Sequence, residues 1–302
     1  MSLSYLLTGA SGFLGNYLQD YLSATGSKVL SLGRSADSTI ACNLATEIPI
    51  INEPADVVIH AAGKAHVVPK SDVEKQEFFD VNLTGTINLC KGLEAMAVRP
   101  RHFVFISTVA VYGVDAGENI DEQHPLNGIT PYAKSKIAAE DFLKEWCAKN
   151  DVILSVLRLP LIAGKNPPGN LGAMVNGIKT GRYFNINGGL AKKSVVLAAD
   201  IAKCIPLVAP KGGTYNLTDG YHPCFAELAG IIAKQCGKPS PKNIPGWVAK
   251  CIAIAGNLLG NKAPINTDKL HKITATLTFN DSHARKAFGW NPQRVLEAFT
   301  IS

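Results

Sequence analysis

The sequence lacks the cysteine patterns of metal sites and disulfide frameworks. Its seven cysteines form no Cys-x-x-Cys pair, and none stands at a metal-ligand spacing from a histidine. An odd number of cysteines scattered through apolar segments is typical of reduced thiols in a cytoplasmic protein. We therefore expect a cytoplasmic location, with no bound metal and no disulfide.

Dense blocks of charge and long apolar runs are missing as well. The net charge is +6, and no basic run is dense enough to favour nucleic acid over a small anionic substrate. No basic segment precedes the first apolar stretch, so we expect no signal peptide. The most apolar late segment, 247–259, is too short to span a bilayer. It predicts an amphipathic helix, with docking on a membrane surface as an alternative.

What the sequence does have is a glycine-rich turn near its start. Residues 5–15 read Tyr-Leu-Leu-Thr-Gly-Ala-Ser-Gly-Phe-Leu-Gly, which is an apolar strand, a turn and a helix start. Gly9 permits a tight turn, Gly12 lets the backbone approach phosphates, and Gly15 lets the helix pack closely. The helix N-terminus would face the anion. The glycine spacing is one residue wider than the usual dinucleotide fingerprint, so taken alone it favours an ordinary strand-to-helix turn.

Apolar strands alternate with helical periodicity over the first 160 residues. Beyond the first strand and turn, strands are expected at 28–32, 55–63, 101–107 and 152–159, and helices at 13–24, 71–97 and from Pro131. This alternation predicts an α/β fold with a doubly wound parallel sheet of the Rossmann type.

The pattern changes after Pro160. Residues 164–172 are rich in Gly, Pro and Asn and predict a hinge loop. We expect a dinucleotide-binding domain over 1–160, rejoined by about 193–220. A smaller C-terminal α+β substrate lobe is expected over 161–302.

The end of the second strand bears on the choice of cofactor. It reads Gly33-Arg34-Ser35, with no acidic residue before Asp37. NAD sites usually place an acid here for the adenosine ribose, whereas an arginine accommodates the 2′-phosphate of NADP. We therefore expect NADP. The alternative is NAD, with Arg34 in solvent and Asp37 at the ribose.

A tyrosine and a lysine provide the candidate chemistry. Tyr132 and Lys136 are four residues apart on an expected helix, so they share one face. A phenol has a pKa near ~10, and an ammonium about 4 Å away supplies roughly the 4 kcal/mol that would bring this pKa near neutrality. We expect the pair to exchange a proton with a substrate oxygen while hydride moves to or from the adjacent carbon. Thr108, at a strand end, can bind the same oxygen.

Together these motifs resemble the extended short-chain dehydrogenase/reductase family of NAD(P)-dependent sugar-nucleotide epimerases, dehydratases and reductases. The segments that carry the resemblance are Thr8–Gly15, His60–Ala62, Asn82, Ser107–Thr108, Val111–Gly113, Tyr132–Lys136, Leu157–Arg158, Tyr215–Leu217 and Phe288–Pro292. The resemblance implies that Tyr132 is the catalytic acid/base, Lys136 its partner and nicotinamide-ribose ligand, and Thr108 the third catalytic residue.

The motifs and the resemblance together give the expected binding residues. Cofactor contacts are expected at Gly9, Ser11, Gly12, Phe13, Leu14, Gly15, Arg34, Ser35, Asn43, Leu44, Ala61, Ala62, Gly63, Asn82, Tyr132 and Lys136. Substrate contacts are expected at His66, Thr108, Asn170 and Lys193. His60, inside an apolar strand, is expected to be structural. Family members often dimerise through helices that include the one with the catalytic tyrosine, so a homodimer is open to this chain.

Departures from the family pattern narrow the expected activity. Val109 and Ala110 replace the Asp-Glu pair of the dehydratases, and Leu161 stands where epimerases often have Asn. Gly33-Arg34 suits an exchangeable NADPH better than the NAD that epimerases retain. Residues 60–66 resemble the branch that reduces UDP-linked 4-keto sugars.

We therefore expect NADPH-dependent reduction of the 4-keto group of a nucleotide-linked sugar, with UDP as the favoured nucleotide and Tyr132 as proton donor. The first alternative is an NAD-dependent UDP-sugar 4-epimerase that uses the same residues in both directions. The second is an NAD(P)-binding regulator that has lost catalysis.

Overall fold

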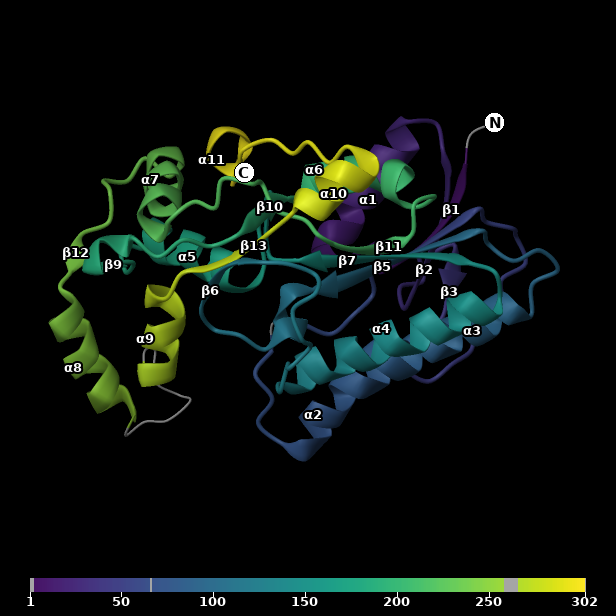
Figure 1. The fold of residues 1–302 in the computed structure, drawn as a ribbon, viewed down its shortest axis with the longest axis horizontal. Coiled ribbons are helices and arrows are strands. Elements are labelled where there is room, and N and C mark those ends of the chain that lie inside the picture. Colours follow the sequence, from purple (N-terminus) through teal and green to yellow (C-terminus); the bar gives the residue numbers. More distant parts are fainter. Residues whose placement is uncertain (1–2, 66, 258–265, 302) are drawn as a thin grey trace.

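The computed structural model describes residues 3–65, 67–257 and 266–301 (Figure 1). Its centre is a seven-stranded sheet with the order β11-β7-β5-β4-β1-β2-β3, in which every pair of neighbours is parallel. The strands are β1 Ser4–Thr8, β2 Lys28–Gly33, β3 Ile40–Ala41, β4 Val57–His60, β5 His102–Thr108, β7 Ile153–Leu159 and β11 Gly213–Asn216. The expected α/β fold with a doubly wound parallel sheet is confirmed.

Helices cover both faces of this sheet (Figure 1). The covering helices are α1 Phe13–Ala24 and α6 Ala198–Val208 on one face, and α3 Gly85–Glu94 and α4 Pro131–Lys149 on the other. Leu7 of β1 belongs to the apolar core under α1, whereas its neighbour Leu6 belongs to the core under α3. Burial on both faces explains why the central strands are near-continuous apolar runs.

The strand order reverses between β1 and β4. From β1 the sheet continues through β2 to β3, and from β4 it continues the other way through β5 and β7 to β11. In open parallel sheets, ligands bind beyond the carboxyl ends of the strands where the order reverses. Here that point follows Thr8 of β1 and His60 of β4, which are paired in register.

A smaller lobe is built mainly from the second half of the chain. Its elements are β6 Gly117–Ile120, β8 Leu161–Ala163, α5 Gly169–Lys179, β9 Asn185–Ile186, β10 Val195–Leu197, α7 Phe225–Gln235, β12 Asn243–Ile244, α8 Gly246–Asn257, α9 Thr267–Thr274, β13 Leu277–Phe279 and α11 Val295–Ala298. Helix α10, Ser282–Phe288, instead packs into the core of the central sheet next to β11. Three two-stranded parallel sheets and an apolar cluster around α5 and α7 hold it together. The sequence limits of the two domains stay a prediction.

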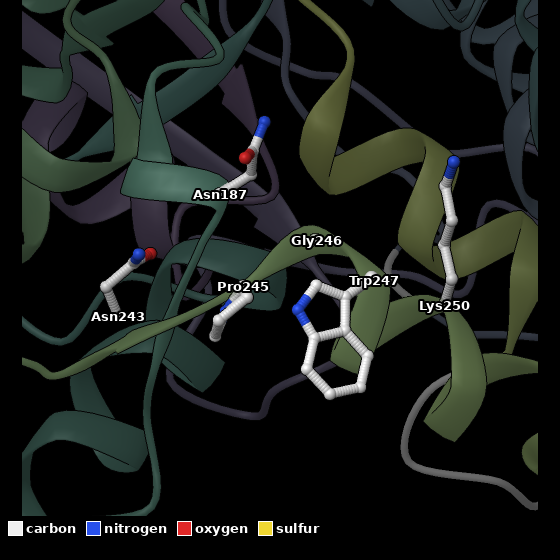
Figure 2. A pocket seen from close by; sticks show the side chains of 6 residues that line it. All are labelled: Asn187, Asn243, Pro245, Gly246, Trp247 and Lys250. Atoms are coloured by element: carbon white, nitrogen blue, oxygen red, sulfur yellow. The ribbon is translucent and has the colours of Figure 1, made fainter.

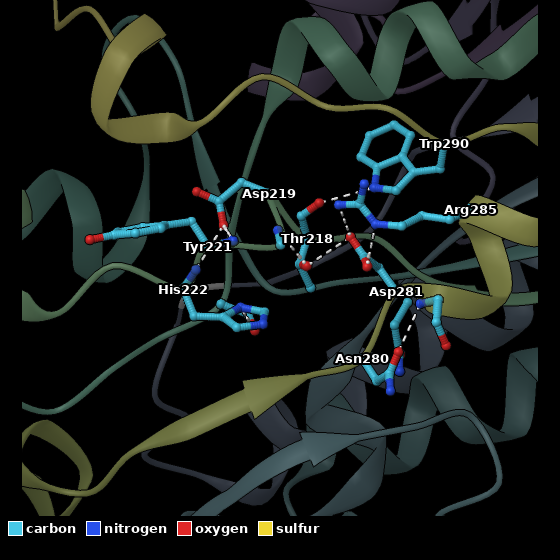
Figure 3. A network of polar contacts seen from close by, with 12 residues as sticks. Thr218, Asp219, Tyr221, His222, Asn280, Asp281, Arg285 and Trp290 are labelled. Carbon is cyan, nitrogen blue, oxygen red and sulfur yellow. Dashed lines mark hydrogen bonds and ion pairs between the residues drawn. The ribbon is translucent and has the colours of Figure 1, made fainter.

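A buried polar network ties this lobe to the chain after β11 (Figure 3). Asp281 accepts two hydrogen bonds from the guanidinium of Arg285, at 2.8 and 2.9 Å, and one from the hydroxyl of Thr218 at 3.1 Å. The indole of Trp290 donates to the carbonyl oxygen of Thr218 at 3.0 Å. Asp219 accepts three backbone N–H groups. The late motif that contains Trp290 therefore has a structural role.

The helix expected over 71–97 is interrupted. α2 covers Asp72–Phe79, a π-helical turn follows at Asp80–Thr84, and α3 ends at Glu94. Single π-helical turns recur at functional sites because they redirect one side chain. This turn carries Asn82, whose contacts are described below.

One expected loop, and one segment for which no element was expected, contain regular structure. Residues 164–172 were expected to be a loop, but α5 begins at Gly169 after the extended residue Pro168. The polar segment before α4 contains β6, which pairs with β13 near the end of the chain. Four residues are too few to show the alternation of a strand in the sequence. The partner that pairs with them is distant in sequence.

All seven cysteines are free thiols. Within the described residues, no three His, Cys, Asp or Glu side chains are grouped to hold a metal ion. In the same ranges, none of the helices combines the length and the hydropathy needed to cross a membrane.

Candidate active site

The glycine-rich turn after β1 lies directly against the end of β4. Gly9 has a φ of +74°, a left-handed conformation that strains most side chains. A Cβ atom at Gly9 would lie 2.7 Å from the backbone nitrogen of Ala62 and 2.8 Å from the carbonyl carbon of Ala61. At Gly15 a Cβ atom would lie 2.0 Å from the carbonyl oxygen of Gly9. Backbone therefore closes both sides of the turn, and only glycine fits.

The N-terminus of α1 offers backbone N–H groups to a ligand. Its N-cap residue, Gly12, has no side chain to bind them, and the first turn of the helix contains no acidic residue. Ser11 and Gly12 are exposed, Phe13 is half-buried, and Leu14 is in the core. The first N–H groups of a helix have no partner within it, and the helix dipole is positive there. This end of α1 therefore suits a phosphate or diphosphate.

Asn82 joins the loop after β4 to helix α4. Its side-chain oxygen accepts a hydrogen bond from the backbone N–H of Lys64 at 2.7 Å. Its amide nitrogen donates to the hydroxyl of Ser135 at 2.9 Å and to the Lys64 carbonyl at 3.1 Å. A Cβ atom at Gly63 would lie 3.1 Å from the Asn82 oxygen and 3.3 Å from Nζ of Lys136. Three expected cofactor contacts, Gly63, Asn82 and Lys136, thus converge.

His60 is a fully hydrogen-bonded structural residue. The hydroxyl of Thr86 donates to the Asn82 carbonyl at 2.6 Å, so its oxygen accepts from Nε2 of His60 at 3.0 Å. Nδ1 is then the acceptor, and the hydroxyl of Thr8 donates to it at 2.7 Å. The Thr8 oxygen accepts the N–H of Ala62 at 3.1 Å. Burial lowers the pKa of His60 to about 3, so the neutral ring holds β1, β4 and α3 together at physiological pH.

Lys136 extends from α4 to the carboxyl end of β5. Its Nζ donates to the carbonyl oxygen of Ile106 at 2.8 Å and lies 4.4 Å from the centre of the Phe105 ring. Burial lowers the pKa of Lys136 to about 8, against the opposing charge of Glu140. The amine remains mostly protonated at neutral pH. An ammonium has three donors, so two remain for a ligand.

Tyr132 and Thr108 meet between α4 and β5. Burial raises the pKa of Tyr132, and a hydrogen bond with Thr108 opposes this effect without overcoming it. The expectation that Lys136 lowers this pKa is therefore wrong for this structure. The amine of Lys136 is held by Ile106, and the loss of water around the phenol is the larger effect. The phenol is protonated at neutral pH and can donate a proton.

A buried ion pair fixes α4 behind these residues. The Glu140 carboxylate accepts hydrogen bonds from Arg158 at 2.7 and 3.2 Å, and it also accepts the hydroxyl of Ser107. Arg158 donates further to the hydroxyl of Tyr112 at 3.2 Å. Sequence reasoning placed Arg158 in a motif but gave it no partner. The sequence signal that could have revealed this pair was Glu140, which follows Lys136 by one turn on the same expected helix.

The expected adenosine contacts lie beyond β2 and β3. Arg34 directly follows β2 and is exposed. The hydroxyl of Ser35 donates to the carboxylate of Asp37 at 3.3 Å, so an acid does stand beside the expected phosphate position. Asn43 and Leu44 follow β3 at the same edge of the parallel sheet. The end of β2 is therefore compatible with either NADP, bound by Arg34, or NAD, bound by Asp37. The preference for NADP stays a prediction.

The expected substrate contacts lie on other elements. Lys193 is half-buried, forms an isolated bridge with Leu277 of β13, and has its pKa lowered by burial. Asn170 is exposed in the first turn of α5. Within the described residues, no recorded contact joins either side chain to the catalytic trio. His66 lies outside the described residues.

A protein family and several individual proteins are similar to this chain over most of its length. A family model described as the NAD dependent epimerase/dehydratase family matches residues 5–218. A UDP-glucose 4-epimerase of Vibrio cholerae is 24% identical over 317 residues, which cover 98% of this chain and 93% of that protein. A GDP-6-deoxy-D-mannose reductase of Pseudomonas aeruginosa is 36% identical over 153 residues, which cover 48% of each protein.

Solved structures share the fold over nearly the whole chain. MoeE5 in complex with UDP-glucose and NAD has a TM-score of 0.73 at 18% identity, covering 97% of this chain and 95% of that one. RMD from Pseudomonas aeruginosa complexed with NADPH has a TM-score of 0.69 at 22% identity, covering 98% and 96%. At such identities the likeness establishes the fold alone.

Proposed function

Because this chain belongs to the NAD-dependent epimerase/dehydratase family, we propose that it transfers hydride at C4 of a nucleotide-linked sugar. Family membership makes it an NAD(P)-dependent enzyme of sugar-nucleotide metabolism; the carbon and the direction are our proposal. One observation carries it. Thr108, Tyr132 and Lys136 converge next to the loop that meets the glycine-rich turn, at the reversal of the strand order.

The residues at this point fit a nicotinamide dinucleotide. The backbone cradle around Gly9 and the free N–H groups of α1 suit its diphosphate. The two remaining donors of Lys136 suit the hydroxyls of a ribose. The nicotinamide supplies or accepts the hydride. Both NAD and NADP are compatible with the family.

The protein side chains handle the proton. Burial keeps the phenol of Tyr132 protonated, so it can donate to a substrate oxygen as a carbonyl becomes a hydroxyl. The hydroxyl of Thr108 holds that oxygen within reach of the phenol. In the reverse direction the phenol must first give up its proton, against the cost that burial imposes on the phenolate.

The first candidate activity is 4-epimerisation. The names of the relatives support it better than reduction, because several of them are UDP-glucose 4-epimerases. In this activity Tyr132 takes a proton from the 4-hydroxyl and returns it after the intermediate ketone has been reduced on its other face. The cofactor is regenerated in each cycle.

The second candidate is a single reduction of a 4-keto sugar nucleotide. Exposed Arg34 directly after β2, with no acidic residue in the sequence before Asp37, favours an exchangeable NADPH. A reductase of a GDP-linked deoxy sugar is among the relatives. A regulator without catalysis is disfavoured, because a protein that only binds the cofactor has no need of all three residues Thr108, Tyr132 and Lys136.

One experiment separates these activities. The protein as purified is analysed for bound nicotinamide and is then incubated with UDP-hexoses, and separately with UDP- and dTDP-4-keto sugars plus NADPH or NADH. An epimerase retains NAD and interconverts UDP-hexoses with no net redox change. A reductase consumes one NADPH for each keto sugar. A protein that binds cofactor and converts no member of either panel contradicts the proposal. The cytoplasmic location and the homodimer stay predictions.

A further inference from the structure

Helix α8 has the reverse of the usual amphipathic arrangement. Its small residues Ala249, Ala253 and Gly256 are buried, and the two alanines belong to the minor apolar cluster that includes Leu270 of α9. Its large apolar residues are instead exposed, with Trp247 at 71%, Ile254 at 62% and Ile252 at 46%. A surface helix normally buries its large apolar side chains. Several exposed together mark a site of interaction.

Three of the exposed residues form one stripe, which does not include Ile252. Trp247, Cys251 and Ile254 are spaced by four and then three residues, so they lie on a single face of the helix. Lys250, also exposed, borders this stripe. Figure 2 shows the indole of Trp247 beside Pro245, with Lys250 one turn further along α8. A cavity of about 550 Å³ opens next to them. Figure 1 places α8 at the far end of the molecule from α3.

The stretch of sequence around α8, bounded by Glu227 before it and by Asp268 in α9, carries charge of one sign. Residues 228–267 contain five lysines and no aspartate or glutamate, although the net charge of the whole chain is only +6. Among the described residues, Lys238 and Lys242 are exposed just before α8, and Lys250 is exposed within it. An apolar stripe with a tryptophan and flanking lysines is the pattern of helices that lie in the headgroup region of a bilayer.

We propose that the outer face of α8 docks the protein on the surface of a bilayer that contains anionic lipid. The stripe enters the boundary between headgroups and acyl chains, and the lysines bind the negative surface. A second copy of the chain fits less well, because a two-fold contact through α8 would bring the lysines of both copies together. The proposal is independent of the reaction at Tyr132.

Sedimentation with vesicles tests this docking. The full chain is mixed at low ionic strength with vesicles of phosphatidylcholine alone, or of phosphatidylcholine and phosphatidylglycerol in equal parts. We expect binding to the mixed vesicles that weakens with added salt. Ile254→Glu and Lys250→Glu should each lower the partition coefficient by at least about tenfold. The matched controls Val98→Glu and Lys211→Glu, at exposed positions elsewhere, should change it by less than about twofold.

Tryptophan fluorescence gives a second readout. Trp247 is exposed, whereas Trp146 and Trp290 are 6% and 5% exposed, so a blue shift on adding mixed vesicles reports Trp247. This shift should disappear in Trp247→Phe. The proposal is overturned by absence of binding to the mixed vesicles, or by equal losses in the α8 variants and their controls. It is also overturned if light scattering shows that Ile254→Glu converts a dimer to a monomer while vesicle binding is unchanged.

Discussion

The Nζ atom of Lys136 is hydrogen-bonded to the carbonyl oxygen of Ile106 at 2.8 Å, so the amine is held at the end of β5 before any ligand binds. The cost of this arrangement appears in the pKa of Lys136, which burial lowers from 10.5 to about 8. One carbonyl and the face of the Phe105 ring replace only part of the lost hydration. Function and stability therefore oppose each other at this residue.

Replacing Lys136 by methionine tests this opposition. Below pH 8 the amine is charged in both the folded and the unfolded state, and the folded state bears the full cost of burial. Between pH 8 and 10.5 the unfolded state binds more protons, so wild-type stability rises with pH. Lys136→Met should therefore be more stable than wild type by about 2 kcal/mol at pH 7, and this advantage should shrink by about pH 10. Activity should be lost.

Urea unfolding at both pH values measures the difference. Lys134→Met is the matched control, because Lys134 is exposed on the same helix. Its effect on the free energy of unfolding should be small, because its side chain is in solvent. A Lys136→Met variant that is less stable than wild type at pH 7 would show that the contact with Ile106 outweighs desolvation.

Tyr132→Phe should abolish proton transfer while leaving the site intact. The ring lies 6.2 Å from that of Phe78 between centroids, and phenylalanine keeps this packing. We expect turnover to fall by about 10²–10⁴ with little change in cofactor affinity. Tyr221→Phe, an exposed tyrosine in the second lobe, is the control. Turnover within about twofold of wild type in Tyr132→Phe would remove this residue from the mechanism.

Arg34 and Asp37 offer a paired test of the cofactor. If Arg34 binds a 2′-phosphate, Arg34→Ala should raise the KM for NADPH by about tenfold or more and leave that for NADH unchanged, since a charged hydrogen bond is lost. If instead Asp37 binds the ribose, Asp37→Ala should raise the KM for NADH. Steady-state kinetics with both cofactors and both variants decides. Equal changes in the KM values for NADPH and NADH would show that the residues after β2 do not discriminate between the two cofactors.

Much of the sheet was predictable because its signals are local. The apolar runs, the glycines of the first turn and the Thr130-Pro131 start of α4 each determine structure over a few neighbouring residues. The hydroxyl of Thr130 caps α4 as such a signal requires, accepting the N–H of Ala133 at 3.1 Å. The strand β6 depends on a partner near the end of the chain, so no local pattern reveals it. The π-helical turn at Asp80–Thr84 has no signal in the apolar periodicity either.

The site was predictable in its members and less so in its electrostatics. Sequence spacing brings Tyr132 and Lys136 to one helix face, but it does not reveal that Ile106 binds the amine. The same limit applies to Glu140 and Arg158, which lie on different elements and pair only in the fold. Sign and size of a pKa shift depend on such contacts and on burial, which a motif does not contain.

Two helical glycines allow the cradle itself to be tested. A Cβ atom at Gly15 of α1 would lie 2.0 Å from the carbonyl oxygen of Gly9, whereas a Cβ atom at Gly230 of α7 would meet nothing within 4 Å. Gly15→Ala should therefore displace the turn, lower stability by about 3 kcal/mol and weaken cofactor binding. Gly230→Ala should raise stability by up to about 1 kcal/mol, because alanine is the better helix former. Thermal unfolding and fluorescence titration with NADPH and NADH measure both effects. Equal stability and equal cofactor affinity in the two variants would mean that Gly15 does not shape the binding turn.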